Sequence, residues 1–180
     1  MTDTLPQRET YRHGDVATQA LDRAMESMAQ TGGVPSLRAL AKAVGVTHAA
    51  LYRHFDSRNA LLDALAGRGF DRLAERIQGG RNRADVIDAY VRFALSNPTL
   101  YGTMMTRSNR SFGEAGTLSS AFARTLSAVR GALGDDAEDR DIQALWVMLH
   151  GAVSLHGNGI LQTPSESALI RFVSDLDKPV

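Results

Sequence analysis

The 180-residue chain contains no cysteine, which excludes a disulfide framework, a thiolate metal site and a cysteine nucleophile. It also lacks any run approaching the ~18–20 apolar residues that a membrane-spanning helix needs. The N-terminal segment is polar and has no apolar core of the kind found in secretory signals. We therefore expect a cytoplasmic protein with no membrane partner.

The chain also lacks net charge, which taken alone argues weakly against a nucleic-acid partner. The local balance is different between residues 36 and 60, where the charge is +3 and two histidines lie nearby. The charged residues of this segment are Arg38, Lys42, Arg53 and Arg58 against Asp56. A small basic surface on a neutral protein can dock on phosphates, while giving modest nonspecific affinity.

Neither β-type alternation of any length nor an internal repeat occurs, whereas apolar residues recur with helical spacing along the chain. We therefore predict an all-α fold of about nine helices, separated by glycine, proline and polar breaks. Two short helices are expected within residues 36–55. The others are expected at about residues 14–30, 57–80, 84–96, 99–106, 117–133, 139–156 and 165–176. Residues 107–116 are polar, contain glycine and are predicted to form a loop.

The most informative segment is residues 36–55. Its first helix has apolar residues spaced i, i+3, i+4, i+7 on one face: Leu37, Leu40, Ala41 and Val44. Gly45 can take the positive φ that stops a helix in a sharp turn. Thr47 is a natural N-cap for the second helix.

The second helix is expected to bury Ala50, Leu51 and Phe55. The side chains left facing outward are polar, aromatic or basic, apart from one alanine: His48, Ala49, Tyr52, Arg53 and His54. A helix pair with a glycine turn can be a simple packing corner. This outward surface suits a phosphate-lined groove better, so the segment is typical of a helix-turn-helix motif.

The run SLRALAKAVGVTHAALYRHFDSRNALLDALA resembles the DNA-binding domain of the tetracycline-repressor (TetR) family of bacterial transcription regulators. The pattern that carries the resemblance is L-A-x-x-x-G-V-[ST]-x-x-x-L-Y-x-H-F. It is met at Leu40, Ala41, Gly45, Val46, Thr47, Leu51, Tyr52, His54 and Phe55. The resemblance is strong over residues 12–66.

A second resemblance lies in residues 144–155. Trp146, His150 and Gly151 fit the W-x-x-x-H-G signature of one C-terminal domain class of this family, in which the domain regulates and dimerises. The sequence N-P-x-L-Y at residues 97–101 and the Met104–Met105 pair fit the same class.

The resemblance implies a flexible tail at 1–12, a helix-turn-helix DNA-binding domain at 13–56, a linking helix at 57–80, and a ligand-binding and dimerisation domain at 81–180. For the DNA-binding side chains, we expect Thr47, His48 and Ala49 to approach base edges in the major groove. Phosphate contacts are expected from Ser36, Arg38, Tyr52, His54 and Arg58, with Arg58 at a position where the family usually has a lysine. Arg53 is a candidate for contact with either a base or a phosphate.

Effector-pocket candidates in the second half are aromatic, methionine or histidine side chains. They are Phe93, Tyr101, Met104, Met105, Phe122, Trp146 and His150. Flexible methionines suit pockets for varied apolar ligands, although ordinary core packing is the more expected role for these residues. Trp146 and His150 share a helical face and could line the core, the pocket or a dimer interface.

The sequence therefore predicts a DNA-binding transcription regulator, with a ligand-responsive repressor as the first hypothesis. It would bind a palindromic double-stranded DNA operator as a homodimer through its last two helices, and respond to a small-molecule effector. We expect no catalytic site, metal or cofactor, because no catalytic constellation, Gly-rich phosphate loop or suitable ligand spacing occurs. The alternatives are a small helical ligand carrier or enzyme that uses the C-terminal cavity, and an activator or corepressor-dependent regulator.

Overall fold

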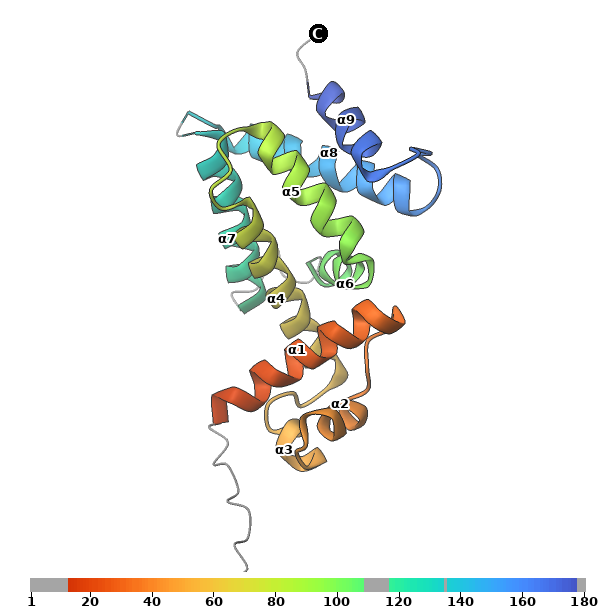
Figure 1. The fold of residues 1–180 in the computed structure, drawn as a ribbon. Coiled ribbons are helices and arrows are strands. Elements are labelled where there is room, and N and C mark those ends of the chain that lie inside the picture. The colour runs from red at the N-terminus through yellow and green to blue at the C-terminus, as the bar shows by residue number, and fades with distance from the viewer. Residues whose placement is uncertain (1–12, 109–116, 135, 178–180) are drawn as a thin grey trace, which may run out of the picture. The chain divides into compact units, whose positions relative to one another are not determined.

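A computed structural model describes residues 13–108, 117–134 and 136–177. Within these ranges the chain forms nine α-helices and no strand, so the all-α prediction is confirmed (Figure 1). The chain divides into two compact units, Met1–Leu61 and Leu62–Val180. None of the described helices is long and apolar enough to cross a membrane.

The first unit contains α1 (His13–Thr31), α2 (Leu37–Val44), α3 (His48–Tyr52) and the beginning of α4 (Arg58–Ile77). Helix α2 packs against both α1 and α3. Their shared core consists of apolar side chains that are less than a tenth exposed: Val16, Ala20, Ala24, Met25, Met28, Leu37, Leu40, Ala41, Val44, Leu51 and Phe55.

Helix α3 is shorter than predicted, because the chain leaves the helix at Arg53. Phe55 therefore reaches the core from the turn that follows, where its backbone N–H donates to the Leu51 carbonyl over 3.0 Å. Ala50, which the sequence predicted as buried, is only half-buried. A five-residue helix has one fully inward position, and Leu51 occupies it.

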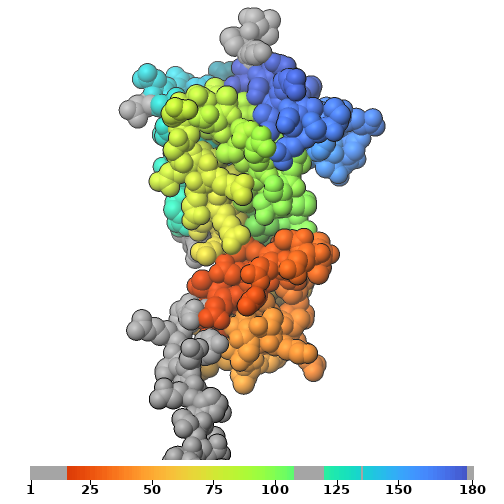
Figure 2. Space-filling view, in the orientation of Figure 1, coloured from red at the N-terminus to blue at the C-terminus, as the bar shows by residue number. Residues whose placement is uncertain are grey.

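The second unit continues α4 and adds five helices: α5 (Arg83–Ser96), α6 (Pro98–Ser108), α7 (Thr117–Leu133), α8 (Asp139–Gly157) and α9 (Glu166–Leu176). Helix α5 lies at its centre and packs against each of the four helices that follow it. The space-filling view shows the blue surface of α9 against the green surface of α5 (Figure 2). The predicted loop at 107–116 was wrong at its start, because Arg107 and Ser108 extend α6; residues 109–116 lie outside the described ranges.

Ion pairs fasten the helices of the second unit to one another. The Arg83 guanidinium donates to both carboxylate oxygens of Asp177 over 2.6–2.9 Å, and this carboxylate raises the pKa of Arg83. The nearly buried Arg107 of α6 donates to Asp63 of α4 over 2.6 Å. These contacts hold α9 on α5 and α6 on α4 by hydrogen bonds that are stronger than those between neutral groups.

Candidate nucleic-acid interface

The α2–α3 motif is held by a cap at the start of each helix and by a glycine at the turn between them. Ser36 caps α2 by accepting a hydrogen bond from the Ala39 N–H over 3.1 Å. Gly45 ends α2 with φ +77°, a left-handed conformation that glycine adopts at little cost. Thr47 caps α3 in the same way as Ser36, accepting from the Ala50 N–H over 3.1 Å. These contacts fix the direction of α3 relative to α2.

The caps leave both hydroxyl groups able to act on a partner. In each cap the side-chain oxygen accepts a hydrogen bond, and the hydroxyl proton stays available for donation. Ser36 and Thr47 are both exposed, at the first turns of two successive helices. The same two side chains can therefore hold the motif and donate to a phosphate or a base edge.

The exposed surface of α3 is aromatic and polar. The rings of His48 and Tyr52 stack edge to face with centroids 4.5 Å apart, and Tyr52 is 41% exposed. Ala49 and Arg53 are exposed beside them. Tyrosine combines an apolar ring with a hydrogen-bonding hydroxyl, which suits a surface that contacts a partner.

His54 was predicted to face outward, but it is half-buried and has other interactions within the protein. Its backbone N–H donates to the Leu51 carbonyl over 2.9 Å. The ring therefore lies beside the exposed surface of α3 rather than fully on it.

Two arginines flank the motif. Arg38 is exposed in the first turn of α2, and Arg58 is exposed at the first residue of α4. Ser57 caps α4 by accepting from the Ala60 N–H over 3.1 Å, while the Arg58 guanidinium lies 3.5 Å from the Val34 carbonyl oxygen. That weak contact leaves the Arg58 charge accessible to a phosphate.

The predicted pocket residues lie in the second unit, mostly packed against each other. Phe93, Tyr101 and Met104 are buried, and the other four are half-buried: Met105, Phe122, Trp146 and His150. The Trp146 ring lies 5.2 Å from that of Phe122 and 5.3 Å from that of Tyr90. Two surface grooves lie beside α7, and none of these seven residues lines either of them.

A hydrogen-bonded chain of three side chains runs through this cluster. The Tyr90 and Tyr101 hydroxyls are 2.9 Å apart, and the Tyr101 hydroxyl lies 2.8 Å from His150 Nδ1. Burial lowers the pKa of His150 and raises that of Tyr101 to about 12, so the imidazole is neutral and the phenols keep their protons at pH 7. Tyr90 therefore donates to Tyr101, which donates to His150; the reverse order would leave the buried Tyr90 proton without an acceptor.

The sequence analysis placed the dimer contact on the last two helices but did not identify the large apolar residues that are exposed there. These residues are Val147 (70% exposed) and Leu155 (45%) on α8, Ile160 (71%) after it, and Phe172 (39%) and Leu176 (56%) on α9. The signal was present in the sequence, because residues 144–149 read ALWVML with no polar position for solvent. A helical segment that is apolar on all sides is stable only when every side is shielded from water by other apolar groups.

Comparisons with known proteins agree with this arrangement. Residues 84–175 match the family model described as tetracyclin repressor-like, C-terminal domain, and residues 20–65 match that of bacterial regulatory proteins, tetR family. An uncharacterized HTH-type transcriptional regulator, found in two strains of Mycobacterium tuberculosis, is 31% identical over 160 residues, covering 82% of this chain and 76% of the relative.

Solved structures show the same fold. A protein of unknown function from Rhodococcus sp. RHA1 is 29% identical with a TM-score of 0.71, covering 94% of this chain and 96% of that one. A TetR transcriptional regulator from the same organism is 24% identical with a TM-score of 0.56, covering 91% of this chain and 93% of that one. The capped helix-turn-helix, the helical second unit and these matches together establish that the chain belongs to the TetR family and is a DNA-binding transcriptional regulator.

Proposed function

We propose that the protein is a ligand-responsive repressor that binds a palindromic operator as a homodimer. The observation that carries this proposal is the pairing of an exposed, capped helix α3 in the first unit with an uncovered apolar surface in the second. A single short helix reads too few bases for specific binding, so two copies are needed. Their recognition helices would occupy half-sites about one DNA turn apart, ~34–36 Å.

The dimer would form through α8 and α9. Val147, Ile160 and Leu176 are each more than half exposed, although burying such side chains is favourable by about 1.5–3 kcal/mol each. In a two-fold dimer the same surface meets itself, so one apolar surface per chain suffices. Two helices from each copy would then form a four-helix bundle.

Within the helix-turn-helix we assign base contacts to Thr47, His48 and Ala49 in the first turn of α3. Phosphate contacts come from the flanking exposed groups Ser36, Arg38, Tyr52 and Arg58, with His54 at the edge and Arg53 placed for either role. Exposure of the guanidiniums and hydroxyls supports this division, because phosphate oxygens accept hydrogen bonds from both kinds of group.

The effector would act on the second unit. We assign this unit to the W-x-x-x-H-G class of C-terminal domains. The cluster of Tyr101, Trp146 and His150 supports this, since it combines an aromatic wall with a half-buried polar ring. Phe93, Met104, Met105 and Phe122 would complete its surroundings. A ligand shifts operator binding only as far as it prefers one conformer of the protein over the other.

The test is titration of the full-length protein onto DNA that flanks its own gene, followed by footprinting. We expect a protected inverted repeat, a stoichiometry of two protomers per site, and affinity that falls steeply with salt. Absence of any shift at low salt would contradict the proposal and favour a helical ligand carrier. Protection of a single asymmetric half-site would support DNA binding but contradict the proposal that the protein binds as a dimer.

A further inference from the structure

Helix α8 has one face that the rest of the described chain leaves uncovered. Val147 and Leu155 are exposed on this face, whereas Leu145 and Leu149 are buried on the opposite one. The residues of the uncovered face are spaced i, i+3, i+7 and i+11, as residues on one side of a helix are: Ala144, Val147, Gly151 and Leu155. A glycine therefore lies between two exposed aliphatic side chains.

Contacts on the flank of α8 keep this face outward. The Trp146 ring lies 5.3 Å from the Tyr90 ring, and the Tyr101 hydroxyl donates to His150 Nδ1 over 2.8 Å. His150 directly precedes Gly151 in the sequence. Helix α8 could therefore not turn Gly151 inward without breaking the hydrogen bond between Tyr101 and His150.

The packing of the described residues does not require a glycine at position 151. A Cβ placed on Gly151 would meet nothing within 4 Å, whereas a Cβ placed on Gly69 would lie 2.6 Å from Met104 Sδ. A glycine in a helix interior makes folding about fivefold less favourable than an alanine does. Gly69 is explained by the neighbour that approaches it, and Gly151 has no such neighbour among the described residues.

Gly102 of α6 is also open, but it lies on a polar face. Thr99 and Thr106 are its neighbours on that side of the helix, and the Thr106 hydroxyl donates to the Gly102 carbonyl over 2.8 Å. Water can satisfy such a face. Gly151 differs because its neighbours along the helix are apolar.

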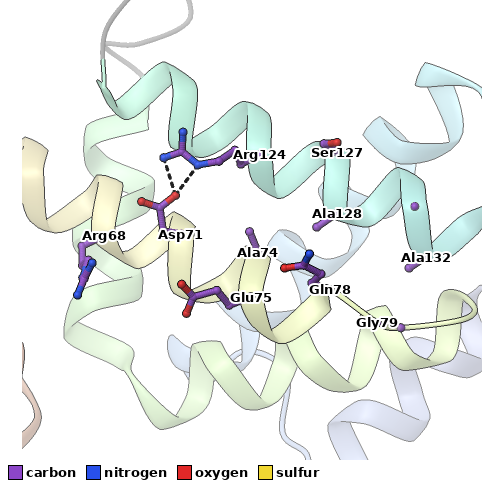
Figure 3. A pocket seen from close by; sticks show the side chains of 12 residues that line it. Arg68, Asp71, Ala74, Glu75, Gln78, Gly79, Arg124, Ser127, Ala128 and Ala132 are labelled. Carbon is purple, nitrogen blue, oxygen red and sulfur yellow. Dashed lines mark hydrogen bonds and ion pairs between the residues drawn. The ribbon is translucent and has the colours of Figure 1, made fainter.

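The surface between α4 and α7 is likewise suited to water. Its groove of about 710 Å³ is lined in part by charged side chains of both signs (Figure 3): Arg68, Asp71, Glu75 and Arg124. Asp71 and Arg124 form an ion pair over 2.6 Å. By contrast, residues 142–165 contain no Asp, Glu, Lys or Arg. The uncovered face of α8 therefore suits an apolar partner.

The absence of charge also favours a second copy of this chain as that partner. In a two-fold dimer, residues at the axis meet their own copies, so a charge there would lie against the same charge. A large side chain at the axis would likewise meet itself and hold the two helices apart. A glycine lets two backbones approach closely. On this face, Gly151 is the position that permits the closest approach.

We propose that α8 crosses its own copy at Gly151, with Val147 and Leu155 packing on either side of the crossing. The proposal deepens the dimer part of the proposed function and rests on it. It assigns the two-fold axis to one residue, so substitutions that enlarge this residue should separate the two protomers.

The first experiment measures the dimer dissociation constant of the full-length protein by sedimentation. Gly151→Ala should raise this constant about tenfold, because one methyl group from each copy overpacks the crossing. Gly151→Leu should leave no dimer at micromolar concentration. The matched controls are Gly102→Ala and Gly102→Leu, which enlarge an open glycine of α6 and should leave the constant unchanged.

The second experiment asks whether the protomer itself needs this glycine. In the background of Val147→Glu, which we expect to be monomeric, Gly151→Ala should raise the folding equilibrium constant by up to about fivefold. The same methyl group would then stabilise the protomer and weaken the dimer. Loss of protomer stability in Gly151→Ala would show that the glycine serves packing within the chain, and would overturn the proposal.

The third experiment uses the absence of cysteine from the chain. A disulfide requires Cα atoms about 4.4–6.8 Å apart, which two helices that cross at this residue provide. Gly151→Cys should therefore form a covalent dimer in the presence of oxidised glutathione, and Gly102→Cys should not. Equal cross-linking of the two variants would contradict the crossing.

These results separate the crossing from the dimer itself. A parent protein that stays monomeric at every concentration would overturn both. A dimeric parent whose dissociation constant is unchanged by Gly151→Leu would retain the dimer of the proposed function and overturn the crossing at Gly151.

Discussion

The helix pairs α2–α3 and α8–α9 differ in what they leave on the protein surface. The first pair buries its leucines and Val44 and exposes hydroxyls, rings and guanidiniums. The second pair is joined by a turn in which the His156 ring contacts Thr163 and the Leu161 carbonyl, and it exposes large aliphatic and aromatic side chains. The first surface complements a polyanion in water, and the second complements only another apolar surface.

This difference separates recognition from assembly. Contacts to phosphate and base depend on charge and salt, whereas contacts between apolar surfaces depend on the area removed from water. Substitutions in α2–α3 should therefore change the salt dependence of DNA binding, whereas substitutions in α8–α9 should change dimerisation.

Operator binding should be lowered more by a substitution in the apolar surface of α8 than by one in the exposed surface of α2 and α3. Replacing Val147, which is 70% exposed, by glutamate would place two like charges in a two-fold interface and prevent dimerisation. Operator affinity should fall roughly 100-fold or more, because each protomer then binds its half-site alone. Sedimentation velocity and fluorescence anisotropy measure the two effects.

The matched control is Ala84→Glu at an exposed position of α5. It adds the same charge at an exposed position outside α8 and α9, so it should leave a dimer of full affinity. A dimeric V147E variant with normal operator binding would refute the assignment of this surface.

The basic surface of the first unit should respond in a different way. Arg58→Ala should weaken binding to all DNA sequences by about tenfold, or ~1.4 kcal/mol. The slope of log affinity against log salt should flatten by about 0.9 for each phosphate that the variant no longer neutralises. The dimer should persist. The conservative Tyr52→Phe variant should likewise weaken binding to every sequence.

Arg81→Ala serves as the comparison for Arg58→Ala, since Arg81 is an exposed arginine of the second unit. The assignment is wrong if both arginine variants show the same salt slope as the parent protein.

The two regions also differ in how far the sequence could predict them. The α2–α3 motif is held by contacts three or four residues apart, such as Ser36 to Ala39 and Thr47 to Ala50, so a spaced pattern identifies it. The end of α3 was predicted too late because helical spacing continues into the turn that carries Phe55. Boundaries are set by capping contacts that periodicity does not encode.

In the second unit the informative contacts join distant residues. Tyr101 and His150 are 49 positions apart, and Arg83 and Asp177 are 94 apart. Helical periodicity predicts which face of each helix is buried, but it does not predict which other helix covers that face. The sequence therefore predicted the helices and some members of the cluster, but not the partnership of Tyr90 with Tyr101 or the groove beside α7.

Packing of α4 in the second unit can be tested with two glycines on the same helix. A Cβ at Gly69 would lie 2.6 Å from Met104 Sδ and 2.7 Å from its Cγ, whereas a Cβ at Gly67 meets nothing within 4 Å. Gly69→Ala should destabilise the protein by about 1–3 kcal/mol through overpacking. Gly67→Ala should stabilise it by up to about 1 kcal/mol through helix propensity.

Chemical denaturation of the two alanine variants measures both effects. Equal stability changes in G69A and G67A would contradict the close approach of α6 to α4.

The smallest effect concerns the hydrogen-bonded chain. Burial lowers the pKa of His150 below its ordinary 6.5, so the folded state favours the neutral ring. This contribution to stability is fully present above pH 6.5 and is lost as the pH falls through the folded pKa. A protonated His150 could no longer accept from Tyr101, and the chain would have to reverse.

Unfolding free energies of the parent and of His150→Gln should therefore converge as the pH falls from 7.5 to 5. The glutamine variant does not titrate in this range and is the control. Parallel pH profiles for the two proteins would mean that His150 does not carry this dependence.

The most direct test of a dimer that reads two half-sites is the spacing of those half-sites. On the footprinted operator, inserting five base pairs at its centre turns one half-site by about half a helical turn. We predict that dimer binding to this DNA collapses, and that an insertion of ten base pairs, which restores the facing of the half-sites, recovers more affinity than the five-pair insertion. Unchanged affinity for the five-pair insertion would contradict the account.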